Sequence, residues 1–343
     1  MKIKEAAIFL NTTPKTLRFY EEKGLIYPRK DKSNQYRTYS HEDLYRISTI
    51  LSLREIGMSI PAIKSLLDNP TLSDKQYLDI QRSALFEQWI EMRDMIETVD
   101  KMLLQDDMKD IEPIRQLTNH LKKLKEIRRS WTDRWNFDNQ AANYDNNIKK
   151  DGHVFNIHDG YDQALAKVVD MVQISSGKTV IDIGIGTGNL GSRFLSVGAR
   201  VIGVDQSTLM LQKCKEKYPQ IETRKGHFLA LPLLDQSADA IVSSYALHHL
   251  TDEDKLFALE EMLRVIKPGG QICIADLMFH DNYHRKKVIS SYLRNGNKLA
   301  VESIEDEYFA DKSRILAWLT ERGLFVKAMQ FNDILGLIYI KVN

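Results

Sequence analysis

Short apolar runs alternate with helix-like stretches along the second half of the chain. The runs are rich in β-branched residues, which favour strands, and cover residues 179–185, 201–205, 221–226, 238–243 and 271–276. This alternation predicts a parallel sheet with helices on both faces. Two further runs, 325–330 and 335–342, predict a closing hairpin. We therefore expect an α/β fold with a seven-stranded, mostly parallel sheet.

Helical patterns occupy the first part of the chain. A short helix is expected at 3–10, and Thr13-Pro14 provides an N-cap and a preset first turn for a second helix at 14–23. The charged stretch 28–39 suits a two-stranded wing, and Ser40 with Asp43 predicts the start of the next helix. A fourth helix is expected to begin at 59–61.

These elements together predict a winged helix-turn-helix. Its second helix is expected to bury Leu17 and to fit the major groove of DNA. The side chains that we expect this helix to expose are Lys15, Thr16, Arg18 and Tyr20.

An apolar seam with a seven-residue repeat begins at residue 78. Both sets of residues in it fall on one helix face: Leu78, Leu85, Met92 and Val99, with Trp89, Ile96 and Leu103 four residues after the last three. This pattern is typical of a coiled coil. It also fits a core stripe within one chain, but we favour a dimerisation helix, followed by a second helix at about 114–131.

Composition sets the broad class of the protein. With 343 residues, 43% hydrophobic and 28% charged, the sequence suits two or three globular domains. No targeting segment and no apolar run of about 18 residues is evident, so we expect a cytoplasmic, soluble protein with no membrane partner. Cys214 and Cys273 lack the spacing of a disulfide framework or a zinc site, and no metal is expected.

Charge is uneven along the chain although the net charge is +1. Residues 1–70 contain 12 Lys and Arg against 8 Asp and Glu. This modest basic bias suits the phosphates of DNA.

Three N-terminal segments resemble the MerR family of transcription regulators: 16–26 (TLRFYEEKGLI), 36–40 (YRTYS) and 53–60 (LREIGMSI). The resemblance implies a homodimer that binds double-stranded promoter DNA and acts on RNA polymerase indirectly, by distorting the DNA. It adds Tyr36, Arg37 and Tyr39 to Arg18 and Tyr20 as DNA contacts. The tyrosines could instead pack the core of so small a domain.

The turn at 180–191 (VIDIGIGTGNLG) follows a predicted strand and is rich in glycine, which lets the backbone approach a ligand closely. Residues 186–191 alone also satisfy the dinucleotide-binding fingerprint, with Asp205 at the end of the second strand. Three later segments distinguish the two interpretations: 226–233 (GHFLALPL), 246–250 (ALHHL) and 263–270 (LRVIKPGG).

In these segments the chain resembles class I S-adenosylmethionine (SAM) methyltransferases. The resemblance covers about residues 131–343 and implies a Rossmann-like fold that binds SAM or its product S-adenosylhomocysteine (SAH). The expected domains are thus a DNA-binding domain (1–70), a dimerisation helix and connector (71–130) and a methyltransferase domain (131–343).

The resemblance also assigns the cofactor-binding residues. Asp205 is expected to accept the ribose hydroxyls, and the glycine turn to contact the amino-acid end of the ligand. The family usually has an aspartate for the adenine amine where this chain has His227, which leaves the backbone of Phe228 as the alternative. The full expected set is Tyr144, from the covering segment 137–145, with Asp182, Gly184, Gly186, Gly188, Asp205, Gln206, His227, Phe228 and Ser244.

No catalytic residue is assigned, because a sulfonium is already electrophilic and the task of the protein is to position an acceptor. His248, His249, His280 and Tyr245 are candidates for a general base, each with packing as its ordinary alternative.

Three functions remain open. The first is a MerR-type regulator with a SAM- or SAH-binding methyltransferase domain that takes a small-molecule acceptor or effector. The second is primarily a methyltransferase whose expression is tuned by its own DNA-binding domain. The third is a nicotinamide-binding sensor.

Overall fold

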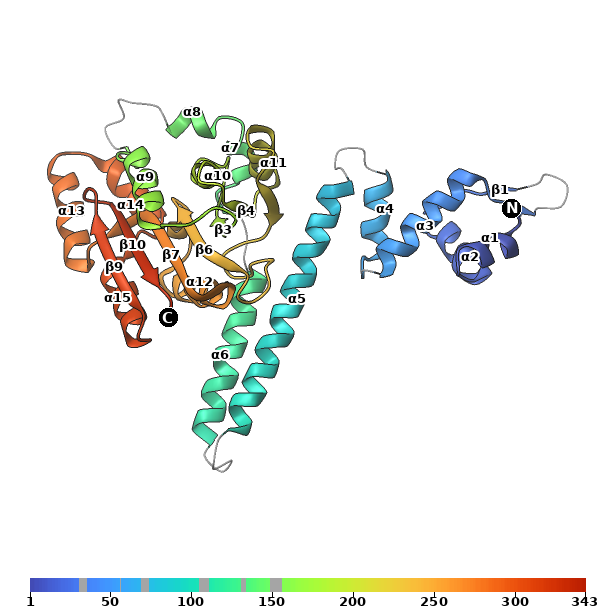
Figure 1. Cartoon of the computed structure of the whole chain (residues 1–343), viewed down its shortest axis with the longest axis horizontal. Coiled ribbons are helices and arrows are strands. Elements are labelled where there is room, and N and C mark those ends of the chain that lie inside the picture. Colours follow the sequence, from blue (N-terminus) through green and yellow to red (C-terminus); the bar gives the residue numbers. More distant parts are fainter. Residues whose placement is uncertain (31–35, 56, 69–73, 105–110, 131–133, 149–155) are drawn as a thin grey trace. The chain divides into compact units, whose positions relative to one another are not determined.

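The computed structural model describes residues 1–30, 36–55, 57–68, 74–104, 111–130, 134–148 and 156–343. These residues form two compact units, Met1–Gln81 and Arg82–Asn343 (Figure 1). The division assigns residues 82–130, most of the expected connector, to the same unit as the sheet.

The first unit is helical, with a small two-stranded ribbon. Thr13 caps the second helix by accepting a hydrogen bond from the backbone N–H of Thr16 at 3.1 Å, and Pro14 occupies its first position. Ser40 and Asp43 exchange hydrogen bonds at the start of the third helix. The elements are α1 (Ile3–Phe9), α2 (Pro14–Glu22), β1 (Arg29–Lys30), β2 (Arg37–Thr38), α3 (His41–Glu55) and α4 (Ile60–Asp68), with β1 antiparallel to β2.

Two tyrosines of this unit belong to its core. Tyr20 is 4% exposed and Tyr39 is 2% exposed, and both pack in the same cluster as Leu17. The expectation that Tyr20 is exposed on α2 is therefore wrong. Tyr20 lies three residues after Leu17, on the same face of the helix, and burying its ring helps so small a domain to form a core.

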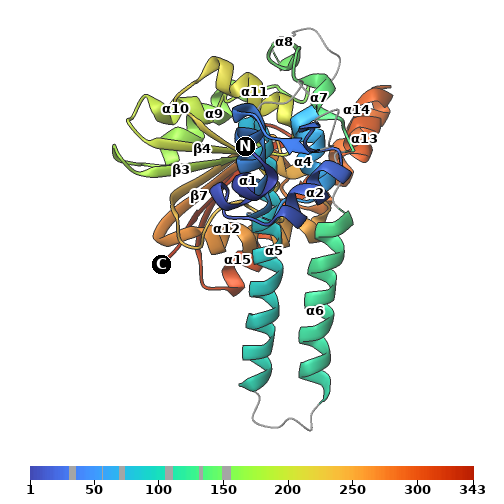
Figure 2. The same cartoon turned by 90° about the vertical axis from the view of Figure 1, so that its right-hand side faces the viewer.

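Two long helices, α5 (Asp74–Leu103) and α6 (Ile111–Ser130), lie before the sheet in the sequence. They run as antiparallel neighbours (Figures 1 and 2). Most of the expected seam on α5 is exposed: Leu78, Leu85, Met92, Ile96, Val99 and Leu103. Trp89 is instead half-buried within the second unit, where its ring lies against the guanidinium groups of Arg93 and Arg264.

The second unit is built on a mixed sheet, in the order β5-β4-β3-β6-β7-β10-β9. The five strands from β5 to β7 are parallel, and β10 is antiparallel to both β7 and β9, which confirms the mostly parallel α/β prediction. The strands are β3 (Thr179–Ile183), β4 (Arg200–Asp205), β5 (Glu222–Lys225), β6 (Ala238–Ser244), β7 (Ile266–Phe279), β9 (Phe325–Gln330) and β10 (Leu335–Lys341). A two-residue strand that was not expected, β8 (Ala310–Asp311), pairs with the end of β7.

Successive residues of the central strands belong to different cores. Val180 and Val201 pack in one apolar cluster, whereas Ile181 and Ile202 pack in the other. This period of two shows that both faces of the sheet are buried, as expected for parallel strands covered by helices.

The helices of this unit begin with two short ones, α7 (Phe137–Gln140) and α8 (Tyr144–Ile148), and the 3-10 turn η1 (Leu247–His249) follows β6. The helices that cover the sheet are α9 (Tyr161–Met171), α10 (Gly191–Leu195), α11 (Thr208–Lys217), α12 (Asp252–Val265), α13 (Asn282–Arg294), α14 (Lys298–Asp306) and α15 (Lys312–Glu321). Among the described residues, none of the helices has the length and apolar character required to cross a bilayer.

Candidate functional site

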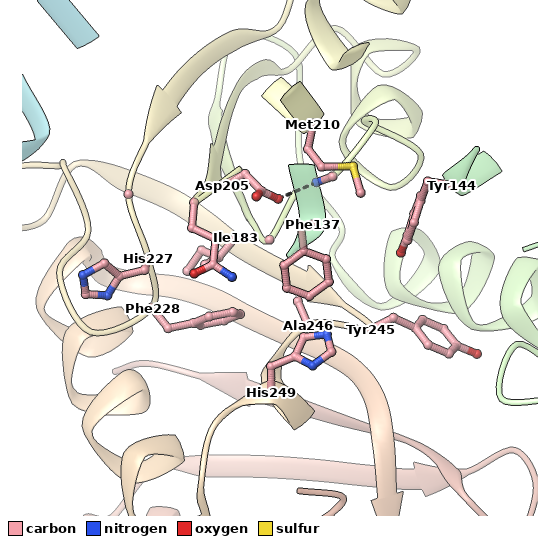
Figure 3. Close-up of a pocket in the computed structure, with 14 residues that line it drawn as sticks. Phe137, Tyr144, Ile183, Asp205, Met210, His227, Phe228, Tyr245, Ala246 and His249 are labelled. Atoms are coloured by element: carbon pink, nitrogen blue, oxygen red, sulfur yellow. Dashed lines mark hydrogen bonds between the residues drawn. The ribbon is translucent and has the colours of Figure 1, made fainter. Parts of the chain in front are cut away.

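A cavity opens at the carboxyl ends of β3, β4 and β6 (Figure 3). This is where ligands bind in open parallel sheets. Most of its lining is apolar or aromatic, and Asp205 is the one carboxylate among the lining residues, all of which lie in the described part of the chain. The cavity is lined by Phe137, Tyr144, Ile183, Gly184, Gly186, Asp205, Gln206, Met210, Gly226, His227, Phe228, Tyr245, Ala246 and His249.

The glycine turn after β3 forms one wall of the cavity. Gly184 has φ +71°, and a Cβ placed on it would lie 2.4 Å from the Cβ of Ala246. A side chain is therefore excluded both by the left-handed backbone and by the opposite wall. The N–H of Gly186 points to Asp205, with 2.9 Å between the nitrogen and Oδ2.

Asp205 is fixed at the end of β4 by backbone donors. Its Oδ2 accepts from Gly186 and its Oδ1 accepts from the N–H of Ser207 at 2.8 Å. The side chain is buried, yet it lines the cavity (Figure 3). Each carboxylate oxygen can accept a second hydrogen bond, so the group is suited to bind vicinal hydroxyls.

His227 lines the cavity but its imidazole is turned away from the centre, whereas the ring of Phe228 lies along the wall (Figure 3). Its Nδ1 accepts from the N–H of Leu229 at 3.3 Å, and its Nε2 lies 3.8 Å from a carboxylate oxygen of Glu87 on α5. Burial, with the nearby charge of Arg128, lowers the pKa of His227 to about 4. The imidazole is therefore neutral at pH 7.

The covering segment formed by α7 and α8 brings Phe137 and Tyr144 to the cavity. Two aspartates attach this segment to the sheet domain. Asp138 accepts from the hydroxyl of Ser207 and from the N–H of Leu209, at the start of α11. Asp145 accepts from the hydroxyl of Thr187 at 2.6 Å and from the side-chain amide of Asn189 at 3.1 Å, both in the glycine turn. It also accepts from the ammonium group of Lys217 on α11 at 2.7 Å.

The opposite end of the cavity is aromatic. The ring of His249 lies 4.9 Å from that of Phe137 and 4.4 Å from that of Trp135, measured between centroids. Burial and the neighbouring His248 lower the pKa of His249 well below its ordinary value, and its Nδ1 has no hydrogen-bond partner within the described residues. Tyr245 adds a buried hydroxyl that is likewise without a partner there. Buried polar atoms usually have a hydrogen-bond partner, so these two are exceptions among the described residues.

His248 serves a different purpose from His249. Its Nδ1 lies 2.5 Å from Asp276, which also accepts from the N–H groups of Ala246 and Leu247. Burial opposes a charge on His248, but Asp276 outweighs it and raises the pKa of His248. Since His248 does not line the cavity, this buried pair fixes the loop that carries Tyr245 and Ala246.

Three expected cofactor-binding residues lie outside the lining: Asp182, Gly188 and Ser244. Asp182 is 1% exposed and lies behind the turn, where a Cβ on Gly191 would be 3.0 Å from its Oδ2. Burial raises the pKa of Asp182 to about 8. Gly188 faces Tyr218 and Cys214 of the α11 region, at 2.8 and 2.9 Å from its ideal Cβ. Both residues shape the turn from behind.

Ile183, Met210, Gly226 and Ala246 line the cavity although they were not expected there. These residues line the cavity because they lie at or just after the end of a strand, or at the start of the helix that follows one. Met210, for example, lies in the first turn of the helix that Ser207 caps directly after β4. A helix that begins next to a strand end presents its first turn to the ligand site, and this signal was present in the sequence.

The expected DNA contacts of the first unit fall into two groups. Lys15, Arg18 and Tyr36 are exposed. The hydroxyl of Thr16 is 2.8 Å from that of Thr13, so Thr16 also takes part in the helix cap. Arg37 lies on β2 and pairs with Glu21 of α2 at 2.5 Å, and Lys30 of β1 pairs with the same carboxylate at 2.7 Å. These pairs join the ribbon to the helix.

Family profiles match both ends of the chain. The profile of MerR helix-turn-helix regulatory proteins matches residues 1–70, and that of the methyltransferase domain matches residues 180–270. The second match contains the glycine turn, Asp205 and the segment around His227.

Among curated relatives, an uncharacterised methyltransferase of Oceanobacillus iheyensis is 34% identical over 206 residues, which cover 60% of this chain and 95% of the relative. A second one, from Anoxybacillus flavithermus, is 30% identical over 203 residues, covering 59% of this chain and 94% of the relative.

Solved structures of methyltransferases are similar as well. A Methanococcus maripaludis protein described as SAM-dependent has 21% identity and a TM-score of 0.45, covering 62% of this chain and 97% of that one. Phosphoethanolamine N-methyltransferase 2 of Haemonchus contortus, solved with SAM, has 20% identity and a TM-score of 0.46, covering 60% of this chain and 57% of that one.

Proposed function

We propose a function for this chain on the basis of its family. The chain belongs to the SAM-dependent methyltransferases and carries a MerR-type helix-turn-helix domain at its N-terminal end. In our proposal the protein is a DNA-binding transcription regulator whose methyltransferase domain binds SAM or SAH. Occupancy of that domain then controls the effect of the protein on a promoter.

The cavity fits a nucleoside that carries an amino-acid tail. Asp205 offers acceptor sites for the two ribose hydroxyls, and the ring of Phe228 offers a stacking surface for a base. The ideal Cβ position of Gly186 is 3.8 Å from its nearest atom, on Tyr144, so the absence of a Cβ there leaves the backbone open to close approach by the tail. This combination of one carboxylate, an aromatic wall and a glycine turn is the observation that carries the proposal.

When bound, SAM supplies an electrophilic methyl group. The protein would hold an acceptor beside that group and exclude water, which is worth roughly 7 to 11 kcal/mol when two reactants are well oriented. Phe137 and Tyr144 would close the cavity from the covering segment. His249, kept neutral by burial, would offer a hydrogen-bonding nitrogen to the acceptor.

For DNA recognition we propose Lys15, Thr16 and Arg18 of α2, with Tyr36 and Arg37 of the ribbon. Exposed cations on α2 suit the major groove and its phosphates. Tyr20 and Tyr39 would contribute by supporting the fold, because their rings are buried in the core.

A homodimer is part of the proposal. The exposed apolar residues Met92, Ile96, Val99 and Leu103 recur at seven- and four-residue spacing on α5. Such a stripe is suited to pair with a second copy of the helix and to hold two DNA-binding domains at half-site spacing.

A second candidate function is catalysis as the main task, with DNA binding limited to self-regulation. The unpartnered Nδ1 of His249 and hydroxyl of Tyr245 next to the cavity favour it, because they are suited to bind an acceptor. A purified transcription assay separates the two candidates. Equal transcript levels with and without saturating SAM, together with methylation of a small acceptor, would favour the second.

Calorimetric titration of the full chain with SAM, SAH and NAD tests the proposed ligand. We expect binding of SAM and SAH but not NAD, and a loss of at least about tenfold in the Asp205→Ala variant, the size expected for charge-assisted hydrogen bonds. Binding of NAD in place of SAM would overturn the assignment and restore the nicotinamide-sensor alternative.

A further inference from the structure

We infer that one wall of the cofactor cavity is held from outside by the α5–α6 hairpin, and that Arg128 of α6 is a positioning residue for cofactor binding. The inference rests on the proposed function, in which SAM or SAH occupies the cavity. It concerns the segment 226–233, which follows β5 and contributes Gly226, His227 and Phe228 to the lining.

Arg128 connects this segment to both helices of the hairpin. Its Nε donates to the carbonyl oxygen of Leu229 at 2.8 Å, and its Nη1 donates to Asp94 of α5 at 2.6 Å. The side chains of Arg128 and Asp94 are 9% and 7% exposed, so both charges are withdrawn from water. Such a pair fixes geometry, because loss of Asp94 would leave the charge of Arg128 uncompensated. If Arg128 were lost, Asp94 would keep its second pair, with Arg93 at 2.5 Å, but the carbonyl of Leu229 would lose its donor.

Further contacts from α5 lie along the same segment. Glu87 lies 3.8 Å from Nε2 of His227, so α5 is a neighbour of this imidazole. Trp89 lies against Arg264, whose guanidinium donates to the carbonyl oxygens of Leu231 and Leu233. The segment thus has the cavity on one side and the helix hairpin on the other.

This arrangement links cofactor affinity to the position of α5. A ligand that stacks on Phe228 would order the segment 226–233. The ordered segment would then favour the position of α5 in which Arg128 and Glu87 keep their contacts. Helix α5 is continuous from Asp74 to Leu103, so it contributes residues to both units. Because SAM and SAH share the adenosine group that meets this wall, both should act alike.

The test uses full-length Arg128→Met and Asp94→Asn, with Lys123→Ala as the matched control. Lys123 is also on α6 and also pairs with the sheet domain, through Glu253 at 2.7 Å, but that pair is exposed and remote from the segment. We expect each variant at the buried pair to lower the affinity for SAM by about tenfold, and the affinity for SAH by the same factor. The control should keep wild-type affinity. Arg128→Lys should recover part of the loss because it keeps the charge.

Hydrogen exchange of the wild-type chain provides a second readout that does not depend on the variants folding. Saturating SAM or SAH should slow exchange in residues 87–94 and 124–128 as well as in 226–233. Wild-type affinity in both variants, or protection confined to 226–233, would overturn the inference. If the wild-type chain bound neither SAM nor SAH, the proposed function itself would fail, which is a distinguishable result.

Discussion

Two buried aspartates of the second unit have opposite surroundings. Asp205 accepts two backbone N–H groups and lines the cavity. Asp182 lies behind the glycine turn, where its burial outweighs a backbone hydrogen bond from Gly191. Burial therefore raises the pKa of Asp182 to about 8, and the carboxyl keeps its proton at pH 7.

The protonated state of Asp182 predicts a pH-dependent stability. The unfolded chain loses this proton near pH 3.8, whereas the folded chain keeps it up to about pH 8. Between these values the folded state binds more protons, so its stability relative to the unfolded state falls as pH rises. Asp182→Asn removes the titration. In thermal melts, the melting temperature of the variant should rise relative to that of the wild type from pH 5 to pH 8. A constant difference between the two melting temperatures would show that Asp182 is ionised in the folded protein.

Gly184 allows steric exclusion to be measured separately from backbone strain. Its ideal Cβ meets Ala246 at 2.4 Å, whereas Gly296, with the same φ of +71°, has open space around it. Both alanine variants share the cost of the left-handed backbone, roughly 1 to 3 kcal/mol. Only Gly184→Ala also distorts the cavity, so its unfolding free energy and its SAM affinity should both fall further. Equal unfolding free energies in the two variants would contradict this account.

The sequence predicted residue types at the site better than side-chain directions. Asp205 and the glycine turn come at the ends of predicted strands, and they therefore lie at the carboxyl edge of the sheet, where the cavity opens. The imidazole of His227 has Glu87 of α5 as a neighbour, and the ring of Tyr20 packs in a core shared by α1, α3 and α4. Such contacts join distant parts of the chain, so local patterns do not specify them.

At the level of single elements, the covering segment is attached to the sheet domain through its aspartates. Asp145 binds Thr187, Asn189 and Lys217, and it is adjacent to Tyr144 in α8. Asp145→Ala should weaken SAM binding by about 3- to 30-fold, mainly through faster dissociation, because the cover would open more readily. Stopped-flow release of SAM measures the effect.

Asp162→Ala is the matched control for the covering segment. Its carboxylate pairs with Arg193 at 2.6 Å but is 88% exposed, so the pair should add little. Equal release rates for Asp145→Ala and wild type would show that the segment does not cover the bound cofactor.

The apolar stripe on α5 predicts self-association. Replacing Met92 and Ile96 by Glu places charges on this stripe and should give a monomer in sedimentation that loses specific DNA binding but keeps SAM affinity. Leu293→Glu on α13, a residue of similar exposure, is the control and should remain a dimer. If the double variant formed a dimer with the dissociation constant of the wild-type dimer, the chains would associate through another surface.

Sequence patterns identified the elements well and their tertiary roles incompletely. The heptad spacing indicated one face of α5, and that face is largely exposed in the single chain. Trp89 fits the same spacing, yet it packs on Arg264 of the sheet domain. A helix that contacts partners on two sides has overlapping apolar patterns, which spacing alone does not resolve.

In our proposal, cofactor binding by the second unit and DNA binding by the first are linked. Linkage is reciprocal, so any change that SAM makes in DNA affinity must equal the change that DNA makes in SAM affinity. Coupling in regulatory proteins is usually a factor of about 5 to 150. We infer that the contacts of α5 and α6 with the cavity wall contribute to this coupling.

The most direct test of this claim is a pair of SAM titrations of the full-length protein, without DNA and with a saturating duplex obtained by selection on the protein itself. The account predicts dissociation constants that differ by about 5- to 150-fold, and the same factor in DNA affinity with and without SAM. Asp205→Ala should bind the duplex with an affinity that no longer responds to SAM. Identical SAM dissociation constants in the presence and absence of the bound duplex would contradict the claim.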